Sequence, residues 1–120
     1  MKYSEIDKYA LSFPGTRKDY KIEWGWERYM LEDKMFLALC YENDKLKYIT
    51  LKLDPQKGEF LRRQYADVIP GYYMNKVHWN SVKPDGCVPD ELLKDMIEES
   101  YNLILSGFSK KKQTEIISQN

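Results

Sequence analysis

Histidine and cysteine are scarce in this sequence, which holds one His and two Cys in 120 residues. Cys40 and Cys87 are not clustered, so they form neither a disulfide framework nor the spacing of a metal site. His78 is the one side chain that titrates near neutral pH without a shift, and nearby Ser81 would point to the opposite face of a strand. A glycine-rich phosphate loop is also missing. We therefore expect a protein that is not an enzyme and uses no metal or cofactor.

Long apolar runs are missing as well. The longest, residues 35–41, is far short of the ~20 residues that cross a bilayer. Residues 1–8 mix charges and contain no apolar stretch of the kind that a secretory signal needs. We therefore expect no membrane partner. A reduced cytoplasmic protein is the simplest interpretation of the two isolated cysteines.

The sequence has no net charge, because 19 basic residues balance 19 acidic ones. This balance excludes a broadly cationic protein that holds nucleic acid by charge alone. The charge is unevenly distributed, with +3 over residues 1–83, −5 over 84–109 and +2 over 110–120. A mildly positive strand region beside an acidic helix permits an anion-binding face, although an ordinary solvated helix surface also explains the acidic block.

Aromatic residues, in contrast, are abundant, with ten Tyr, four Phe and three Trp. These rings are large, rigid packing units, and those of Tyr and Trp carry a polar tip. A chain of 120 residues has the size of one domain, so we expect residues 1–120 to form a single domain.

Hydrophobic patterning and turn residues predict an α+β fold. Helices are expected at residues 4–11, from 55 onward, at 89–107 and at 110–117. Strands are expected at 27–31, 34–42 and 46–53, followed by a turn at 69–71 and extended runs at 72–76 and 78–83. The sheet should be mostly antiparallel, a meander plus a hairpin, and the element order α-βββ-α-ββ-α-α. Residues 35–41 show almost no polar alternation, which is typical of a central strand covered on both faces.

Residues 70–82 hold the densest set of side chains suited to binding, with three aromatic residues, two Asn, one Lys and the single His. On an extended strand, Lys76, His78 and Asn80 would share one face. Rings interleaved with amide and cationic groups suit stacking on bases and hydrogen bonding to phosphates. A structural role is the alternative, in which Trp79 belongs to the core and Asn75 caps a turn.

Several short motifs follow one another along nearly the whole chain. The most specific is Pro70-Gly71-Tyr72-Tyr73-Met74-Asn75-Lys76-Val77-His78-Trp79-Asn80-Ser81-Val82. The others are Phe13-Pro14-Gly15-Thr16, Asp19-Tyr20, Trp24-Gly25, Lys34-Met35-Phe36-Leu37-Ala38, Leu51-Lys52-Leu53-Asp54-Pro55, Leu61-Arg62, Leu92-Leu93, Met96-Ile97 and Ser100-Tyr101. Together they resemble the MmcQ/YjbR-like family. Tyr73 is a departure, since the family more often has His there, and this removes a second titratable group.

The resemblance implies a small bacterial cytoplasmic α+β protein with a YjbR-like double-wing arrangement. Members of the family are often labelled DNA-binding, and this label rests on an analogy of shape. Contact candidates at family motif positions are Lys34, Lys52, Asn75, Lys76, His78 and Trp79. The leading hypothesis is a non-enzymatic DNA-binding or regulatory module whose binding is weak and salt-sensitive. The alternative is a protein- or small-ligand-interaction domain with a pocket lined by Trp24, Tyr72 or Trp79. The oligomeric state and the target stay open.

Overall fold

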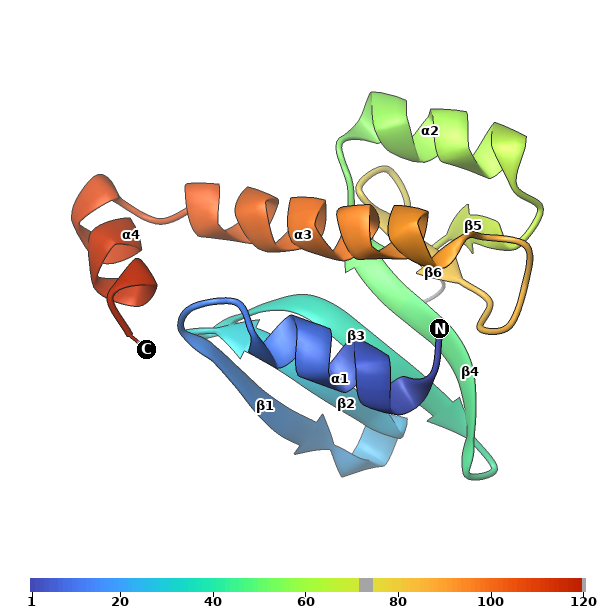
Figure 1. Cartoon of the computed structure of the whole chain (residues 1–120), viewed down its shortest axis with the longest axis horizontal. Coiled ribbons are helices and arrows are strands. Elements are labelled where there is room, and N and C mark those ends of the chain that lie inside the picture. Colours follow the sequence, from blue (N-terminus) through green and yellow to red (C-terminus); the bar gives the residue numbers. More distant parts are fainter. Residues whose placement is uncertain (72–74, 120) are drawn as a thin grey trace.

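The computed structural model describes residues 1–71 and 75–119 (Figure 1). Its elements are α1 (Tyr3–Leu11), β1 (Thr16–Lys21), the 3₁₀ helix η1 (Ile22–Trp24), β2 (Trp26–Leu31), β3 (Lys34–Glu42), β4 (Lys45–Lys52), α2 (Pro55–Gln64), β5 (Val68–Pro70), β6 (Trp79–Val82), α3 (Asp90–Ser106) and α4 (Lys110–Ile117). The six strands of the described chain form one sheet in the order β1-β2-β3-β4-β6-β5, with every neighbouring pair antiparallel. The predicted α+β fold is confirmed.

Local sequence signals place the helices close to where they were expected. The Asp54 carboxylate caps α2 by accepting a hydrogen bond from the N–H of Gln56 at 3.1 Å, and Pro55 occupies the first helical position. Ser109 caps α4 in the same way, through the N–H of Lys112 at 3.1 Å. In the part of the chain that the structure describes, no helix is long and apolar enough to span a bilayer.

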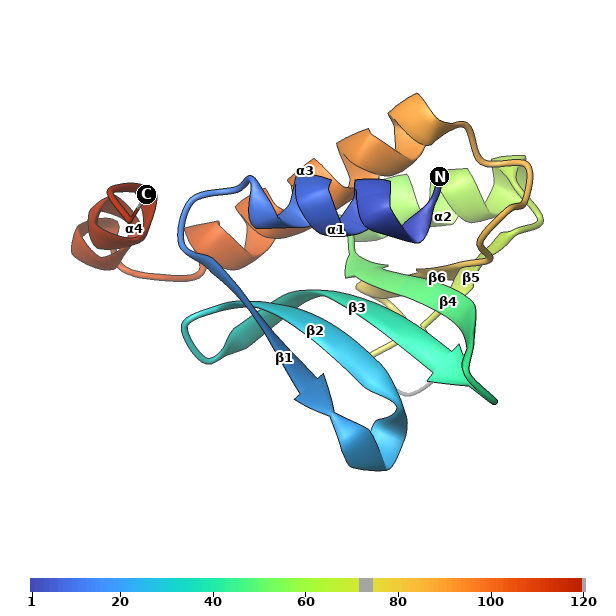
Figure 2. The same ribbon diagram turned by 60° about the horizontal axis from the view of Figure 1, so that its bottom comes forward.

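These helices lie on one face of the sheet, and in the described chain the other face carries none (Figure 2). Ile6 of α1 and Met96 and Ile97 of α3 are fully buried in the core between the helices and the sheet. Apolar residues recur along α3 at three- and four-residue spacing, so one side of this long helix faces the core. The described chain therefore forms two layers, and the side of the sheet away from the helices is a candidate surface for function.

Strands β1 and β5 differ from the prediction. β1 was not expected, because its sequence from Thr16 to Lys21 is polar at almost every position and shows no apolar alternation. It is stable as an edge strand, where charged side chains can reach solvent. β5 lies where a turn was predicted from Pro70 and Gly71. Pro70 is tolerated there because β5 is the other edge strand, which needs hydrogen bonds on one side only.

The segment before β6 is a turn rather than a strand. Of the extended run predicted at 72–76, residues 72–74 lie outside the described residues, and Asn75 and Lys76 are not in a strand. The side chain of Asn75 accepts a hydrogen bond from the N–H of Val77 at 2.9 Å, which is the turn-capping role given above as an alternative. The second predicted run is confirmed as β6, although it begins only at Trp79.

A group of stacked rings joins α3 to the segment after α1. Phe13 stacks on Tyr101 with ring centroids 4.7 Å apart, and Phe36 meets Tyr101 edge-on at 5.3 Å. The Tyr101 hydroxyl donates a hydrogen bond of 2.6 Å to the carbonyl of Pro14. The rings thereby fix the chain between α1 and β1 against the long helix.

A serine of α3 completes the hydrogen bonding between β3 and β4. The ladder of these strands ends at the pair Leu37 and Leu51. One residue further on, the fully buried Ser100 hydroxyl accepts a hydrogen bond from the N–H of Lys52 at 2.8 Å and donates one to the carbonyl of Phe36 at 2.5 Å. The helix thus supplies partners for two backbone groups that the sheet leaves unpaired.

A polar cluster connects α1 to β1 and β2. The Lys18 ammonium donates hydrogen bonds to the Tyr3 hydroxyl at 2.7 Å and to Asp7 at 2.9 Å, and it lies 3.4 Å from Glu27. The hydroxyl of Tyr29 also donates to Asp7, at 2.6 Å. Burial alone would raise the pKa of Asp7, but the hydrogen bonds from Tyr29 and Lys18 outweigh it and hold the pKa below its ordinary value.

Candidate functional site

The side of the sheet that carries none of the described helices, which we call the open face, is identified by one row of paired residues that crosses all six described strands. The row consists of Asp19, Arg28, Ala38, Thr50, Ser81 and Ile69. Side-chain contacts confirm that its members share a face. Arg28 donates two hydrogen bonds of 2.8 Å to Asp19, and the Thr50 and Ser81 hydroxyls lie 2.9 Å apart. The centre of the open face therefore consists of small, buried side chains, and a half-buried ion pair lies toward β1.

Two further rows on the open face combine rings with lysines. The first row lies two residues from the central row along each strand. In it, Trp26 of β2 pairs with Lys21 of β1 and with Cys40 of β3, and Cys40 pairs with Tyr48 of β4. In the other direction, Lys52 pairs directly with Trp79. Tyr48 and Lys52 are four residues apart on one strand, which corresponds to roughly 13 Å. The two aromatic rows thus stand on either side of the small central residues.

A pocket of about 330 Å³ opens beside the first of these rows. Its lining consists of Trp24, Trp26, Cys40, Tyr41, Glu42, Lys47 and Tyr48. We call it the tryptophan pocket, because Trp24 and Trp26 meet edge-to-face, with ring centroids 5.1 Å apart and planes at 71°. Trp24 is 56% exposed, whereas Trp26 is 7% exposed. One indole is therefore a fixed wall, and the other is largely exposed to solvent.

Gly25 explains how two consecutive indoles can line one pocket. Its φ of +69° lies in the left-handed region, and it ends the short helix η1. The Gly25 carbonyl accepts a hydrogen bond of 2.9 Å from the N–H of Tyr41, and a Cβ on Gly25 would lie 2.9 Å from the Tyr41 carbonyl oxygen. A side chain at this position would push β3 away from η1, so the pocket depends on glycine.

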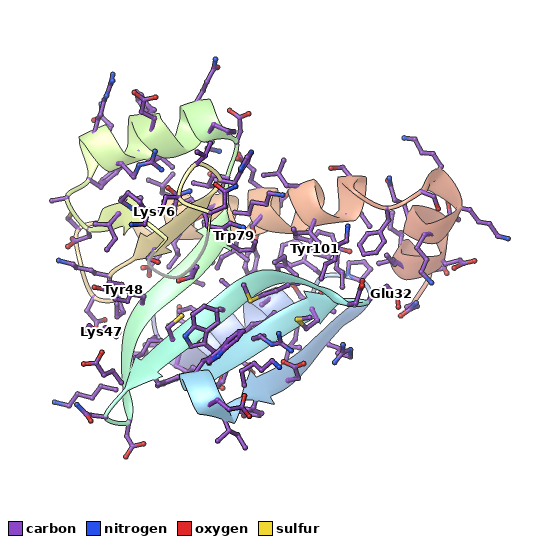
Figure 3. The ribbon with its side chains drawn as sticks, turned by 180° about the vertical axis from the view of Figure 1, so that it is seen from behind. Glu32, Lys47, Tyr48, Lys76, Trp79 and Tyr101 are labelled. Atoms are coloured by element: carbon purple, nitrogen blue, oxygen red, sulfur yellow. The ribbon has the colours of Figure 1, made fainter. Side chains whose placement is uncertain are left out.

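The charged groups of the tryptophan pocket lie close to its rings. The Lys21 ammonium is 5.4 Å from the centroid of the Trp24 ring, and the Lys47 ammonium is 5.9 Å from that of Tyr48. Lys47 also pairs with Glu42 at 2.9 Å. Tyr48 and Lys47 are labelled in Figure 3, where the molecule is seen from behind. The pocket thus combines aromatic rings with ammonium groups that lie over two of them.

Cys40 does not add a reactive group to the pocket. Burial raises the pKa of its thiol to about 11, and the hydroxyl of Thr50 lies 3.6 Å from the sulfur. Burial likewise raises the pKa of Tyr41 to about 12. Both groups stay protonated at neutral pH, which suits the lining of a binding pocket.

The structure brings together part of the predicted nucleic-acid contact set. Lys52 and the half-buried Trp79 are cross-strand neighbours, and His78 precedes Trp79, with its carbonyl accepting a hydrogen bond of 2.8 Å from the N–H of Leu53. Asn75 and the exposed Lys76 lie in the turn before β6 (Figure 3). In the described chain, neither Lys52 nor Lys76 forms an ion pair. These two ammonium groups are available to a partner.

The predicted face shared by Lys76, His78 and Asn80 is wrong. The strand begins only at Trp79, so the alternation of side chains does not extend back through the turn. Asn80 is fully buried on the helix side, where Arg62 of α2 donates a hydrogen bond to its side-chain oxygen.

Lys34 lies away from the other candidates. Its ammonium stands 5.1 Å from the centroid of the Phe108 ring, next to the end of α3, and not in the aromatic rows of the open face. Tyr72, predicted for the alternative ligand pocket, lies outside the described residues. Trp24 does line a pocket, as that alternative proposed, whereas Trp79 is not among the lining residues of the tryptophan pocket.

Trp26, Tyr48, Lys21 and Lys47 were missed as site residues. One signal was present, because alternation along the third predicted strand already puts Tyr48, Thr50 and Lys52 on one side. The position of Trp26 opposite Cys40 depends on strand register, which the sequence pattern does not show.

Charge differs sharply between the two faces. The open face and its tryptophan pocket carry six basic and two acidic side chains, namely Arg17, Lys21, Arg28, Lys45, Lys47 and Lys52 against Asp19 and Glu42. Helix α3 on the other face has one basic and five acidic side chains. The molecule is therefore electrically polar although its net charge is zero.

Comparison with known proteins places this fold in a family. The model of the YjbR family matches residues 11–103. The chain belongs to the YjbR family. Escherichia coli (strain K12) YjbR is 29% identical over 117 residues, 98% of each chain, and Escherichia coli O157:H7 YbdF is 34% identical over 107 residues, 89% of this chain and 87% of that protein. Both relatives are described as uncharacterized proteins.

Two solved structures share the architecture. The crystal structure of Deinococcus radiodurans protein DR2400, with the family domain DUF419, superimposes with a TM-score of 0.84 at 29% identity, covering 94% of this chain and 86% of that one. A Pseudomonas syringae protein superimposes with a TM-score of 0.72 at 26% identity, covering 86% and 98%. The two-layer fold that presents the open face is thus shared with these two proteins.

Proposed function

We propose that this YjbR-family protein is a non-enzymatic module that binds nucleic acid on the open face of its sheet. The observation that carries the proposal is that lysines accompany rings at two places on that face: Lys52 is the cross-strand partner of Trp79, and the Lys21 ammonium lies 5.4 Å from the centroid of the exposed Trp24 ring. Such rings can stack on bases, while the ammonium groups contact phosphates.

The charge distribution supports this side of the molecule as the contact surface. Phosphates would be attracted by the six basic side chains of the open face and its pocket and repelled by the five acidic side chains of α3. A polyanion would therefore approach with the sheet toward it. Because Arg28 and Lys47 are already paired with carboxylates, the number of phosphates neutralised is small and the affinity low.

The salt dependence of binding tests the proposal. A double variant, Lys52→Gln with Lys76→Gln, should weaken binding and reduce the slope of log affinity against log salt by roughly 1.4–1.8, since each phosphate contact contributes about 0.7–0.9. Fluorescence anisotropy with labelled DNA measures both quantities. The matched control is Lys110→Gln with Lys111→Gln, which removes the same charge from exposed positions of α4. Equal slopes in the wild type and the Lys52/Lys76 variant would contradict the proposal.

A second candidate function is the binding of a protein segment or small ligand, and the tryptophan pocket is the observation that favours it. Its volume of about 330 Å³ lies at the lower end of the usual range of small-molecule sites, roughly 300–1,000 Å³. Such binding would be insensitive to salt, in contrast to the first proposal. A ligand held there should raise the melting temperature of the wild type equally in low and high salt, and leave that of Trp24→Ala unchanged.

A further inference from the structure

We infer that the tryptophan pocket receives a single unstacked nucleobase, so that the nucleic acid bound by the open face is single-stranded. This inference rests on the proposed function and specifies its ligand. It starts from Trp24, which is 56% exposed and has the Lys21 ammonium 5.4 Å from its ring centroid, and from the ring of Trp26, whose plane stands at 71° to that of Trp24. A planar ring placed on Trp24 would meet the edge of Trp26 and the side chain of Tyr48.

Duplex nucleic acid cannot use this arrangement. A base inside a duplex is covered on both faces by its neighbours, so it presents only its edge to a protein. A pocket walled by rings needs the face of the base, and only an unpaired strand offers that face without the cost of flipping a base out. The aromatic lining of the pocket and the exposed indole of Trp24 therefore favour a single strand.

The charges around the pocket select an anionic partner over a cationic one. Aromatic pockets also attract organic cations, but here the ammonium groups of Lys21 and Lys47 already lie 5.4 Å and 5.9 Å from ring centroids. A cationic ligand would be repelled by both. A neutral base with a phosphate on either side would instead place its negative charges beside these lysines, while Glu42 offers an acceptor for an exocyclic amino group.

The rest of the open face extends the contact beyond one base. Lys52 and Trp79 form the next row of ring and cation, roughly 13 Å along β4 from Tyr48. Between the two rows, Ala38, Thr50 and Ser81 are 0%, 3% and 1% exposed, so contacts to a strand would come from the two rows and not from these residues. We therefore expect the two rows to bind one continuous single strand.

The experiment compares a fluorescein-labelled 15-nucleotide DNA of mixed sequence with the same DNA annealed to its complement, by fluorescence anisotropy at 50 mM NaCl. The single strand should bind more tightly than the duplex. Trp24→Ala should weaken single-strand binding by about 5- to 150-fold, which corresponds to ~1–3 kcal/mol per stacked base. Trp24→Phe keeps a ring and should recover most of the loss. Phe60→Ala is the matched control, because Phe60 is 58% exposed but lies on α2 at the helix side.

The outcomes separate this inference from the proposed function. Equal binding of single strand and duplex, or unchanged affinity of Trp24→Ala, overturns the inference. If duplex binding then still weakens in the Lys52/Lys76 variant, nucleic-acid binding on the open face stands without the base pocket. Failure of both DNA forms to bind at 50 mM NaCl overturns the inference and the proposed function together. Circular dichroism of each variant shows whether a loss of binding comes from a loss of fold.

Discussion

Replacing Ser100 by Ala tests how the long helix and the sheet are joined. The substitution removes one hydroxyl and leaves the N–H of Lys52 and the carbonyl of Phe36 without their partner. An unsatisfied buried polar group costs about 1–3 kcal/mol. The Phe36 carbonyl lies in the buried interior, whereas the N–H of Lys52 is closer to solvent. We therefore expect the free energy of unfolding to fall by roughly 2–4 kcal/mol.

Alanine itself does not cause this loss. It favours a helix more than serine does, so the intrinsic effect of the substitution on α3 is stabilising. The matched control is Ser106→Ala, on the same helix, since the exposed Ser106 hydroxyl donates only to the carbonyl of Leu103 at 2.8 Å. That variant should stay within about 0.5 kcal/mol of the wild type.

Urea unfolding, followed by far-UV circular dichroism and by tryptophan fluorescence, measures these free energies. Coincident transitions from both probes would show that the domain unfolds in two states, so that the free energies can be compared. If Ser100→Ala is as stable as Ser106→Ala, the hydroxyl does not hold β3 and β4 together, and the reasoning is refuted.

Three further predictions follow from features of the described chain. Gly25→Ala should cost ~1–3 kcal/mol in urea unfolding and should shift the tryptophan emission, because its φ is positive and its Cβ would meet a carbonyl; an unchanged spectrum and stability would contradict this. The pKa of Asp7 is lower in the folded chain than its ordinary value. The carboxylate of Asp7 therefore stabilises the fold at pH values above that ordinary pKa of about 4, and this contribution is lost as the pH falls through the folded-state pKa. The acid-induced loss of stability should therefore be shallower in Asp7→Asn, and equally steep curves would refute the assignment. A thiol reagent at pH 8 should modify Cys87 but not the buried Cys40, giving one reacted thiol per native chain and two in urea; two in the native chain would contradict the burial.

Elements whose signals lie in their own sequence were predicted, and an element that depends on distant contacts was missed. Strand β3 was predicted with its observed bounds, because its apolar residues are continuous, and α4 was located by the Ser109 cap. β1 was missed since its stability comes from partners at distant positions, such as Arg28 for Asp19 and Asp7 for Lys18. The residue propensities of β1 carry no information about those contacts.

The candidate site was predictable only in part for a related reason. Alternation along one strand was enough to place Tyr48 and Lys52 on one side. The tryptophan pocket, however, needs the left-handed conformation of Gly25 and the register of β2 against β3. The burial of β3 on its second face was predicted, but its cause was not, because Trp26 of the neighbouring strand covers Ala38 and Cys40 in place of a second layer of helices.

The two edge strands have a consequence for how copies of this protein meet. β1 carries Arg17, Lys18, Asp19 and Lys21, and β5 is three residues long and ends in Pro70. Charged or short, proline-bearing edges resist the addition of a further strand from another molecule, which is the usual route to fibrils and to sheets shared between subunits. The apolar sequence of β3 would be prone to aggregation if exposed, but both margins of its sheet are protected. Assembly through continued strand pairing is thereby disfavoured.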